Sequence, residues 1–579
     1  MNIEKSKAAC SGPKVFQIGF DLCATVFLRR TFVRNGYRGR TWMEGKLAED
    51  IFYAKYAGEQ PLTEWSNVTF FGTMESTHMP SRPVLEAFKE FEFLHQSFPD
   101  ALFVYDTRDI DDWLRARFRH NGGMHRKIWA TRLDVSDDEL AEIWRKDWWT
   151  HQSNVFDYFG SDERFIHFDC DTPDFDQLSD FLAPWFSINK LPRHAVPRKM
   201  QKQLKTAPKS RKIDVENRRD LAFEERVARH CIGKIAFDNP TTKKPAYSPI
   251  FARWDGAQQV LDKFNKKLPV VWGTDGFFHT KPGTQNLFRV AQTLTEIKSI
   301  GRQSELCLDM QDARFYGIDG ISDIANPIIV YNRQPKTTNM VLWPLPGYHT
   351  LGSTEYAQTT PIDTLDFDQK LDTAGWRGRI NGTTIKELAP NLEKYRLSTL
   401  ILEDFSDAKT AVEIEGYHQE LMGLTRFNLV SRSLFSENID AALTFDPRLN
   451  NFEDHPLFKL LCAKAVLPQW FFKYKYILSI SGYDTGSNFF LAANSNSVVL
   501  KEEDGWELFY TAEFKPWEHY IPLSKGALDV EEKLDWAKQN PVKCMAMSAA
   551  SRRVCAKFAN EASRTNILRT VFDALSPEG

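Results

Sequence analysis

A loop with two glycines follows a short apolar stretch in the last third of the sequence. Residues 476–480 (Tyr-Ile-Leu-Ser-Ile) have the composition of a buried strand, and Gly482 and Gly486 come shortly after it. A glycine-bearing loop at the carboxyl end of a parallel strand is a common place for backbone N–H groups to bind phosphate. These residues predict a phosphate-binding loop, and a plain turn is the alternative interpretation.

A second candidate for phosphate chemistry is the tripeptide Trp376-Arg377-Gly378. The guanidinium group of Arg377 is a rigid fork that can hold a diphosphate, and Gly378 allows the backbone to approach a ligand closely. The alternative is an ordinary solvated arginine.

The third candidate is a strand–loop–helix pattern near the N-terminus. Residues 14–20 predict a strand, residues 19–26 a loop, and residues 25–35 a helix with Gly36 at its C-terminal cap. A nucleotide-binding P-loop needs a second glycine followed by lysine. Ala24 stands at the glycine position and no lysine follows, so this loop is not that of an NTPase.

The length and composition describe the molecule that must position these residues. The chain has 579 residues, of which 42% are apolar and 26% charged, as in packed globular proteins. This length predicts about three to five domain-sized units. The net charge of −3 gives no electrostatic reason to expect a nucleic-acid partner. Aromatic residues reach 13%, which suits both sugar-binding surfaces and large α/β cores.

The cysteines and the apolar stretches bear on the compartment. Eight cysteines are scattered with no Cys-x-x-Cys pair, which predicts reduced thiols in a cytoplasmic protein. Residues 1–19 contain no signal-peptide core, and no apolar stretch approaches 18 residues. Any membrane contact is expected to be peripheral, at the inner face of the cytoplasmic membrane.

Strand-like and helical stretches alternate along most of the chain, which predicts an α/β protein with parallel sheets. Further strands are predicted at residues 101–105, 165–168, 268–272, 327–331 and 497–500, and terminal helices at 530–539 and 549–568. The predicted domains are residues 1–191, a basic linker at 192–212, and two lobes at 213–371 and 372–579. The linker has eight Lys/Arg and no acidic residue. A patch for anionic lipid headgroups is its alternative interpretation.

Residues 14–37 resemble the phosphosulfate loop of a bacterial sulfotransferase family. The resemblance continues at Thr107-Arg108-Asp109 and covers about 170 residues, as a P-loop-type parallel-sheet domain. In that family the loop holds the 5′-phosphosulfate of 3′-phosphoadenylyl sulfate (PAPS), and the arginine holds its 3′-phosphate.

This chain departs from the sulfotransferase pattern at the residues that bind the cofactor. Leu22 replaces the phosphosulfate-binding lysine and Ala24 a glycine. Val26 and Phe27 replace hydroxyl residues, and Ala116 replaces the serine eight residues after the arginine. Each lost charge-assisted hydrogen bond removes about 1.5–3 kcal/mol. We therefore expect an inactive domain that does not bind PAPS.

An ordered set of motifs in residues 210–570 resembles glycosyltransferase family 90. The motifs are Lys-Tyr-Lys-Tyr at 473–476, the glycine loop at 482–488, Ser-Val-Val at 497–499, and Lys-Pro-Trp-Glu-His-Tyr-Ile-Pro at 515–522. The family includes Rumi-like protein O-glucosyltransferases, capsule-associated proteins and lipopolysaccharide-modifying enzymes. The resemblance implies a GT-B fold of two Rossmann-like lobes. It also implies metal-independent, inverting transfer from a nucleotide sugar, usually UDP-linked, to a glycan or lipopolysaccharide acceptor.

The resemblance also assigns roles to single residues. Asp312 matches the family's general base, although Gln311 stands where the family has arginine. Asp309 and Asp319 are the alternatives for the base.

For the donor, the resemblance implies Arg377, Gly378 and Thr383, together with the 482–488 loop that contains Gly482, Asp484 and Asn488. Asn488 replaces an arginine of animal members, and Lys475 is expected to supply the missing charge. Glu507 is the candidate for the ribose hydroxyls.

Three alternatives stay open. Asp-x-Asp triplets at 169–171, 174–176 and 366–368 would suit a metal-dependent GT-A enzyme, but such triplets arise by chance among 77 acidic residues. A bifunctional glycosyltransferase and sulfotransferase is the second alternative, and a non-catalytic glycan-binding scaffold is the third. The hypothesis we carry forward is a glycosyltransferase with a UDP-sugar donor and no other cofactor or metal.

Overall fold

The structure, a computed structural model, describes most of the chain. The described residues are 12–77, 83–133, 135–189, 215–216, 218–238, 247–248, 250–283, 286–312, 314, 316, 324–353, 362–391, 394–445, 449, 452 and 455–576. The predicted linker at 192–212 and the alternative base Asp319 lie outside these residues.

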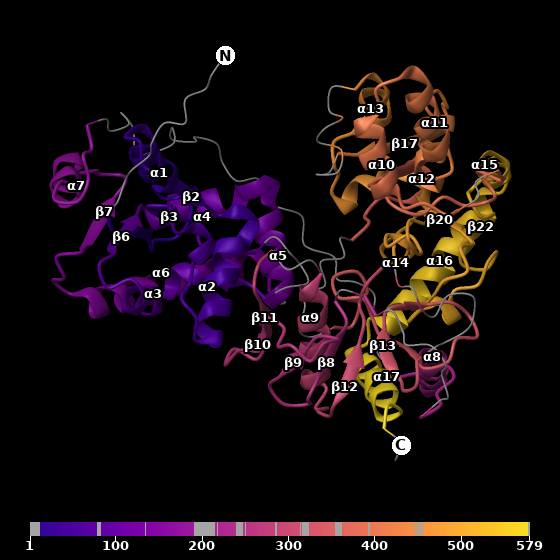
Figure 1. The fold of residues 1–579 in the computed structure, drawn as a ribbon, viewed down its shortest axis with the longest axis horizontal. Helices are drawn as coiled ribbons and strands as arrows, with labels where there is room; N and C mark the ends of the chain where they lie inside the picture. Colours follow the sequence, from indigo (N-terminus) through magenta and orange to yellow (C-terminus); the bar gives the residue numbers. More distant parts are fainter. Residues whose placement is uncertain are drawn as a thin grey trace.

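Three parts of the chain can be followed in Figure 1: the N-terminal unit (residues 12–189), the first lobe (218–353) and the second lobe (362–540). Buried apolar side chains of the N-terminal unit form one cluster. A second cluster joins first-lobe residues to residues between 477 and 572, and a third lies between residues 367 and 547. The chain is an α/β protein, as predicted, and each of the three parts has its own sheet. The domain boundaries set from the sequence stay predictions.

The N-terminal unit contains a parallel five-stranded sheet. In spatial order its strands are β2 (Gly39–Thr41), β3 (Phe70–Gly72), β1 (Val15–Gln17), β6 (Leu102–Thr107) and β7 (Phe165–Asp169). Its helices are α1 (Thr25–Arg34), α2 (Lys46–Ala57), α3 (Phe91–Ser97), α4 (Ile110–Arg119), α5 (Met124–Leu133), α6 (Asp137–Phe159) and α7 (Phe175–Leu182). The strands predicted at 14–20, 101–105 and 165–168 are confirmed as β1, β6 and β7. Every residue of β6 is buried, which explains its continuous apolar run.

The first lobe has a mixed sheet. Its spatial order is β15 (Met340–Leu342), β13 (Ile328–Val330), β12 (Leu306–Leu308), β8 (Ala252–Trp254) and β9 (Val260–Leu261). The first three strands are parallel, whereas β8 and β9 are antiparallel. Helices α8 (Leu221–Ile232) and α9 (Leu287–Ser299) belong to this lobe. Strand β13 confirms the prediction at 327–331.

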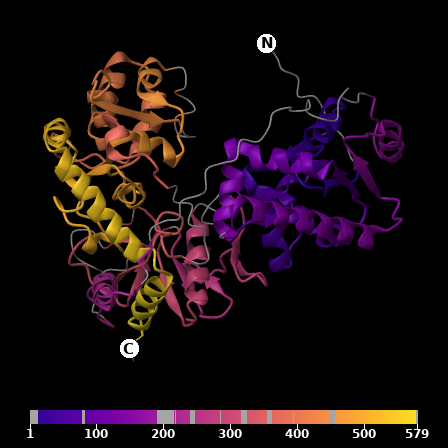
Figure 2. The same ribbon diagram turned by 180° about the vertical axis from the view of Figure 1, so that it is seen from behind.

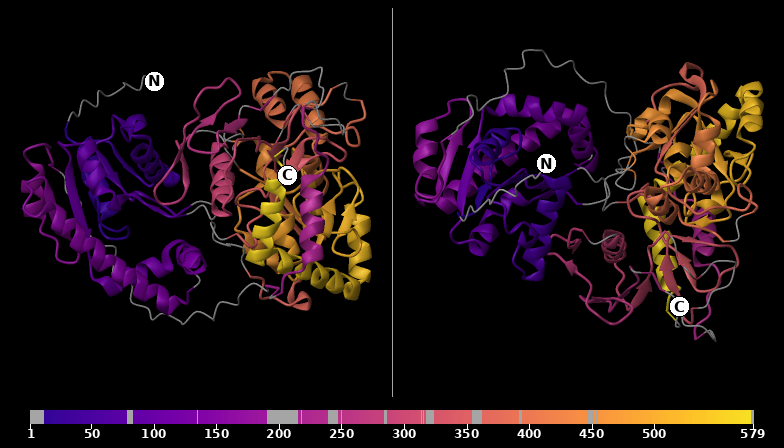
Figure 3. Two further views of the ribbon diagram at one scale, coloured as in Figure 1. Left: turned by 90° about the horizontal axis from the view of Figure 1, so that it is seen from below. Right: turned by 45° about the horizontal axis from the view of Figure 1, so that its top comes forward.

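The strand predicted at 268–272 belongs to a hairpin instead of a parallel sheet. It forms β10 (Val270–Trp272), which pairs antiparallel with β11 (Phe278–Thr280). The short turn between them is closed by a hydrogen bond from Gly273 N to Phe277 O. A parallel crossover needs a much longer connection. The hairpin contacts α2 of the N-terminal unit (Figure 3). The centre of the His279 ring lies 4.9 Å from that of Tyr56.

The second lobe has a six-stranded, fully parallel sheet. Its order is β18 (Cys462–Ala463), β17 (Ile439–Thr444), β16 (Leu371–Gly378), β19 (Tyr474–Ser479), β20 (Val498–Glu502) and β22 (Ile521–Leu523). Its helices are α10 (Ser398–Asp407), α11 (Ala411–Met422), α12 (Thr425–Arg432), α13 (Pro456–Leu461), α14 (Phe489–Ala493) and α15 (Val530–Gln539). From β16 the chain moves outward to β17, and from β19 it moves the opposite way to β20. A crevice for ligands forms where the connections of neighbouring parallel strands diverge in this way.

Two C-terminal helices connect the lobes. Helix α16 (Pro541–Phe558) contacts α14 and β20, and α17 (Glu561–Asp573) packs against α8 of the first lobe (Figures 1 and 2). The single helix predicted at 549–568 is therefore wrong. The helix is interrupted at Asn560, whose side chain accepts a hydrogen bond from Ser563 N and caps α17. The helix predicted at 530–539 is confirmed as α15.

A buried ion pair fixes α17 to the first lobe. Arg564 donates to Glu296 Oε1 from Nε at 2.9 Å and from Nη2 at 2.6 Å, and both side chains are over nine-tenths buried. Arg564 also donates to the carbonyl oxygens of His349 and Leu351. The second oxygen of Glu296 accepts from Trp343 Nε1 at 2.9 Å.

Breaking this pair should destabilise the two lobes. Arg564→Met leaves Glu296 buried without its cation, at a cost of about 3–5 kcal/mol. We expect a lower midpoint in urea unfolding of the full chain, followed by tryptophan fluorescence. Adding Glu296→Gln to the same chain should recover part of the loss, because no unpaired charge then stays buried. An unchanged midpoint for Arg564→Met would contradict the role given to this pair.

Candidate functional site

Two loops meet at the crevice of the second lobe. Residues 379–384 follow β16 and residues 480–488 follow β19, so both stand at the carboxyl ends of central strands. The backbones approach so closely that a Cβ on Gly382 would lie 2.8 Å from the carbonyl oxygen of Gly482. Gly382 also has φ +129°, which L side chains rarely adopt. Glycine at 382 is therefore required for the contact between the two loops.

Arg426 connects the two loops. It lies in the first turn of α12, and its guanidinium donates to Ser481 O and Ile480 O, both at 3.0 Å. It also donates to Arg379 O at 3.2 Å and to the side chain of Asn381. The sequence predicted a cation at this loop but did not identify Arg426, because no motif distinguishes it from other helix-start arginines.

Two acidic residues from the end of β20 order the 480–488 loop. Asp504 accepts hydrogen bonds from Ser481 Oγ at 2.6 Å and from Thr485 Oγ1 at 2.7 Å. Glu502 accepts from Ser481 N at 2.9 Å. The loop is thus held in one conformation before any ligand binds, which lowers the entropy cost of binding.

Side chains of the first lobe contact this loop directly. Asn332, in β14 (Asn332–Arg333), donates from Nδ2 to Asp484 Oδ2 at 2.6 Å. Its neighbour Tyr331 donates from its hydroxyl to Asp312 Oδ1 at 2.6 Å. The predicted base Asp312 and the predicted donor loop therefore come together, although they are far apart in the sequence.

Asp312 is positioned by an arginine that the sequence did not single out. Arg289 of α9 donates to Asp312 Oδ1 at 2.5 Å and to Met310 O at 3.0 Å. Burial lowers the pKa of Arg289, but the nearby Tyr331 and Asp312 outweigh it and hold that pKa above the usual value. The Asp312 side chain is 30% exposed. Both of its hydrogen bonds from described side chains use Oδ1, so Oδ2 is available to a substrate hydroxyl.

Asp484 lies in a setting that disfavours its charge. Burial, followed by the nearby Asp312 carboxylate, raises the pKa of Asp484 to about 7. The hydrogen bond from Asn332 opposes this shift, and Asp504 adds to it. Near neutral pH this carboxyl group is therefore divided between its protonated and ionised forms.

Asp309, the alternative base, has a structural environment. It is fully buried and accepts hydrogen bonds from Ser248 Oγ at 2.6 Å and from Tyr316 Oη at 2.5 Å. The backbone N–H groups of Ser248 and Gln311 donate to it as well. A carboxylate with four donors and no exposure is not placed to accept a proton from a substrate.

Two predicted donor residues lie apart from the loop contact. The guanidinium of Arg377 pairs with Asp440 Oδ1 at 2.6 Å and stacks 4.3 Å from the Trp470 ring, and the side chain is 12% exposed. Lys475 is the second residue of β19, near the strand end opposite the 480–488 loop, and its Nζ lies 3.4 Å from Asp372 Oδ1. The structure therefore places Arg426, rather than Lys475, beside this loop.

The other predicted donor residues have varied surroundings. Gly378 gives room to the Trp376 ring, since a Cβ there would lie 2.5 Å from it. Asn488 Nδ2 donates to Leu478 O at 2.9 Å, which fixes the base of the loop. Thr383 pairs through its backbone with Leu397.

Glu507 is held by Arg333 of β14. Arg333 Nε donates to Glu507 Oε2 at 2.7 Å, and β14 pairs antiparallel with β21 (Glu507–Leu508). Glu507 also lines a cavity of about 290 Å³ with His230, Lys501 and Tyr520. Because Asn332 precedes Arg333, the same short strand reaches both Asp484 and Glu507.

In the N-terminal unit, a side chain of the protein lies where the loop would bind an anion. Ala24 N, at the start of α1, donates to Asp106 Oδ2 at 2.7 Å, and Gln17 Nε2 donates to both Asp106 oxygens at 3.0 Å. Burial raises the pKa of Asp106 to about 7, against the hydrogen bonds from Ala24 and Gln17. A Cβ on Gly19 would overlap Asp106, so glycine is needed there. A carboxyl group therefore stands at the helix start where an anion would bind.

Residues of the Thr107-Arg108-Asp109 segment stabilise the fold of the N-terminal unit. Arg108 Nη1 donates to Leu22 O at 3.2 Å, which steadies the loop. Asp109 caps α4 by accepting from Asp111 N and Asp112 N.

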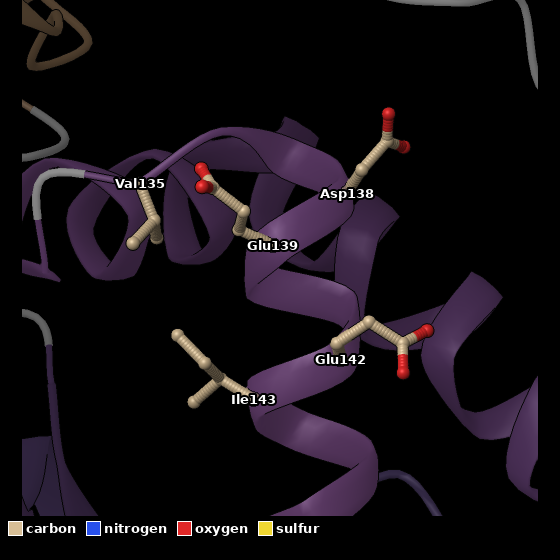
Figure 4. A pocket seen from close by; sticks show the side chains of 5 residues that line it. All are labelled: Val135, Asp138, Glu139, Glu142 and Ile143. Atoms are coloured by element: carbon tan, nitrogen blue, oxygen red, sulfur yellow. The ribbon is translucent and has the colours of Figure 1, made fainter.

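Other features of the described residues add no second site. A surface hollow of about 490 Å³ at the start of α6 is lined by Val135, Asp138, Glu139, Glu142 and Ile143 (Figure 4). Figure 4 shows Asp138 and Glu142 directed away from Ile143, and Glu139 belongs to the capping box with Ser136. The described part of the chain contains no cluster of three or more metal-ligating side chains. None of its helices combines the length and apolarity needed to cross a bilayer.

Comparison with known proteins gives a family match in the C-terminal part of the chain. The sequence model of glycosyl transferase family 90 matches residues 422–562. Protein O-glucosyltransferase 3 of Mus musculus is 41% identical over 71 residues, which are 12% of this chain and 14% of that protein. The Rattus norvegicus protein of the same name is 36% identical over 70 residues, with the same two shares. Uncharacterized protein 027R of Frog virus 3 is 27% identical over 135 residues, 22% of this chain and 13% of the relative.

The matched part of the chain thus spans about one seventh of the length of these relatives. The family match includes Arg426, the 480–488 loop and the Glu507 region. Residues 422–562 are therefore similar to glycosyl transferase family 90.

Proposed function

We propose that the chain transfers a sugar from a nucleotide sugar, UDP-linked, to a hydroxyl group of a glycan acceptor. The observation that carries this proposal is the contact between Asp312 of the first lobe, through Tyr331 and Asn332, and the 480–488 loop of the second lobe. It joins a proton acceptor to a loop placed for a diphosphate. The family match over 422–562 supports the same activity.

In this proposal the two lobes divide the work as in a GT-B enzyme. The second lobe holds the nucleotide at the 379–384 and 480–488 loops, with the positive charge of Arg426 beside them. The first lobe presents Asp312, whose Oδ1 is fixed by Arg289 and Tyr331. Oδ2 takes the proton of the acceptor hydroxyl while that oxygen attacks the anomeric carbon. The nucleoside diphosphate leaves from the opposite face, so the configuration inverts.

The acceptor is proposed to be a glycan or a lipopolysaccharide, reached at the inner face of the cytoplasmic membrane. The curated mammalian relatives carry the name protein O-glucosyltransferase, which makes UDP-glucose the first donor to test. The N-terminal unit is proposed to lack sulfotransferase activity, because Asp106 occupies its anion position.

Removing the base should abolish transfer without abolishing donor binding. Asp312→Asn keeps the size of the side chain but cannot take a proton, so turnover should fall about 10²–10⁴-fold. The measurement is acceptor-free hydrolysis across a panel of nucleotide sugars, beside calorimetric binding of the sugar nucleotide that is turned over. Asp309→Asn is the comparison, and it should lower stability as well as activity. Wild-type turnover by Asp312→Asn would rule out this base.

Two arginines should differ in their effect on the donor. Arg426→Met removes a guanidinium from the loop contact and should weaken UDP-glucose binding about 10–100-fold. Arg377→Met should change the affinity by less than about threefold, because the guanidinium already pairs with Asp440. Calorimetric titration of both full-length variants measures this difference. A larger loss of affinity for Arg377→Met than for Arg426→Met would instead support Arg377 as the residue that binds the donor.

The N-terminal unit should not bind PAPS. Its carboxyl group at the helix start repels the sulfate and phosphate groups, and the lysine of the family loop is absent. We expect no heat of binding when the full chain is titrated with PAPS at millimolar concentration. Saturable binding of PAPS would restore the bifunctional alternative.

A further inference from the structure

The carboxyl group of Asp484 stands in a place that does not suit a negative charge. It lies in the loop proposed to hold a diphosphate, and its hydrogen-bond partner Asn332 belongs to the other lobe. The backbone of the same loop turns at this residue, since Gly482 N donates to Asp484 O at 2.8 Å. Asp484 therefore contacts both the backbone of its own loop and the first lobe.

The groups that face Asp484 come from four parts of the structure. Asp312 follows β12, Tyr331 and Asn332 lie at β13 and β14, Asp504 follows β20, and Tyr510 lies beyond β21. Two of these groups are carboxyls, two are phenols and one is an amide. The nearby cation Arg289 is bonded to Asp312 rather than to Asp484. No described side-chain cation is hydrogen-bonded to Asp484.

A diphosphate adds two negative charges to this environment. If Asp484 were ionised, its charge and that of Asp312 would both act on the donor across the cleft. Like charges within a few ångströms of each other repel strongly at the low effective dielectric of a partly buried site. Protonation of Asp484 removes one of these repulsions, and the neutral carboxyl group can donate a hydrogen bond to an oxygen nearby.

The amide of Asn332 supports a protonated partner. Asn332 is fully buried, and its Oδ1 receives no hydrogen bond from the described residues. A buried amide oxygen without a donor is unfavourable. A proton on Asp484 would supply a donor beside this amide, whose nitrogen and oxygen can exchange places by rotation.

We propose that Asp484 is a positioning residue for the donor. In its uncharged form it joins the 480–488 loop to Asn332 and lets the loop hold the diphosphate of a nucleotide sugar. This inference rests on the proposed function, and it adds that donor binding takes up a proton. Its consequence is a donor site that weakens when Asp484 ionises.

The test is calorimetric binding of UDP-glucose to the full chain between pH 6.0 and 8.5, a range in which neither phosphate of this diester titrates. With the pKa of Asp484 at about 7, affinity should be level below pH 7 and fall by roughly tenfold per unit well above it. The UDP-glucose affinity of Asp484→Asn, and likewise that of Asp484→Ala, should be nearly independent of pH. Asp573→Asn, an exposed substitution in α17, is the matched control and should keep the wild-type dependence.

A second readout separates this role from a general loss of structure. At pH 7.5, titrations in phosphate and in Tris buffers, whose ionisation enthalpies differ, should show that wild type takes up most of one proton per UDP-glucose. Asp484→Asn should take up none. A wild-type affinity that does not change with pH, or a variant that keeps the wild-type dependence, would overturn the inference. If the wild-type chain bound no sugar nucleotide from the panel at any pH, the proposed function itself would fail, and this inference with it.

Discussion

The meeting of two sheets at the carboxyl ends of their parallel strands is the constraint on which the candidate site depends. In the second lobe, the connections from β16 and β19 leave in opposite directions, so their loops stand side by side over a crevice. In the first lobe, Asp312 follows β12 and Tyr331 follows β13. Only when these two edges face each other can Asn332 reach Asp484. Glycine at 382 and the guanidinium of Arg426 hold the loops at this edge.

The covalent path of the chain keeps the two edges opposed. Helix α16 contacts the second lobe, and α17 returns to pack on α8 of the first. The buried pair between Arg564 and Glu296 fixes that return. A C-terminal segment that belongs to both lobes limits how far they can separate. Strand β14 of the first lobe also pairs with β21, so the two lobes are joined by a two-stranded sheet as well.

Strands with continuous apolar runs could be predicted from the sequence, and contacts between distant residues could not. β6, β13 and β19 were found because burial on both faces leaves an unbroken apolar run. β16 was missed because Asp372, Gly375 and Arg377 interrupt its pattern. The resemblance to family 90 led to Asp312 and to the 480–488 loop. Nothing in the sequence pointed to Arg289, Asn332 or Arg426, since each acts through a partner more than twenty residues away.

The N-terminal unit and the second lobe share one local arrangement, but the carboxyl group in it has different partners in the two parts. In each, a loop follows a parallel strand, and a carboxyl group with a pKa of about 7 lies against the loop. Asp106 is fully buried and bonded within its own unit, to Ala24 N and Gln17, so an incoming anion would have to displace an internal contact. Asp484 is partly exposed and bonded to the opposite lobe. The carboxyl group of Asp106 therefore closes the N-terminal loop through contacts within its own unit, whereas the carboxyl group of Asp484 depends on a partner from the other lobe.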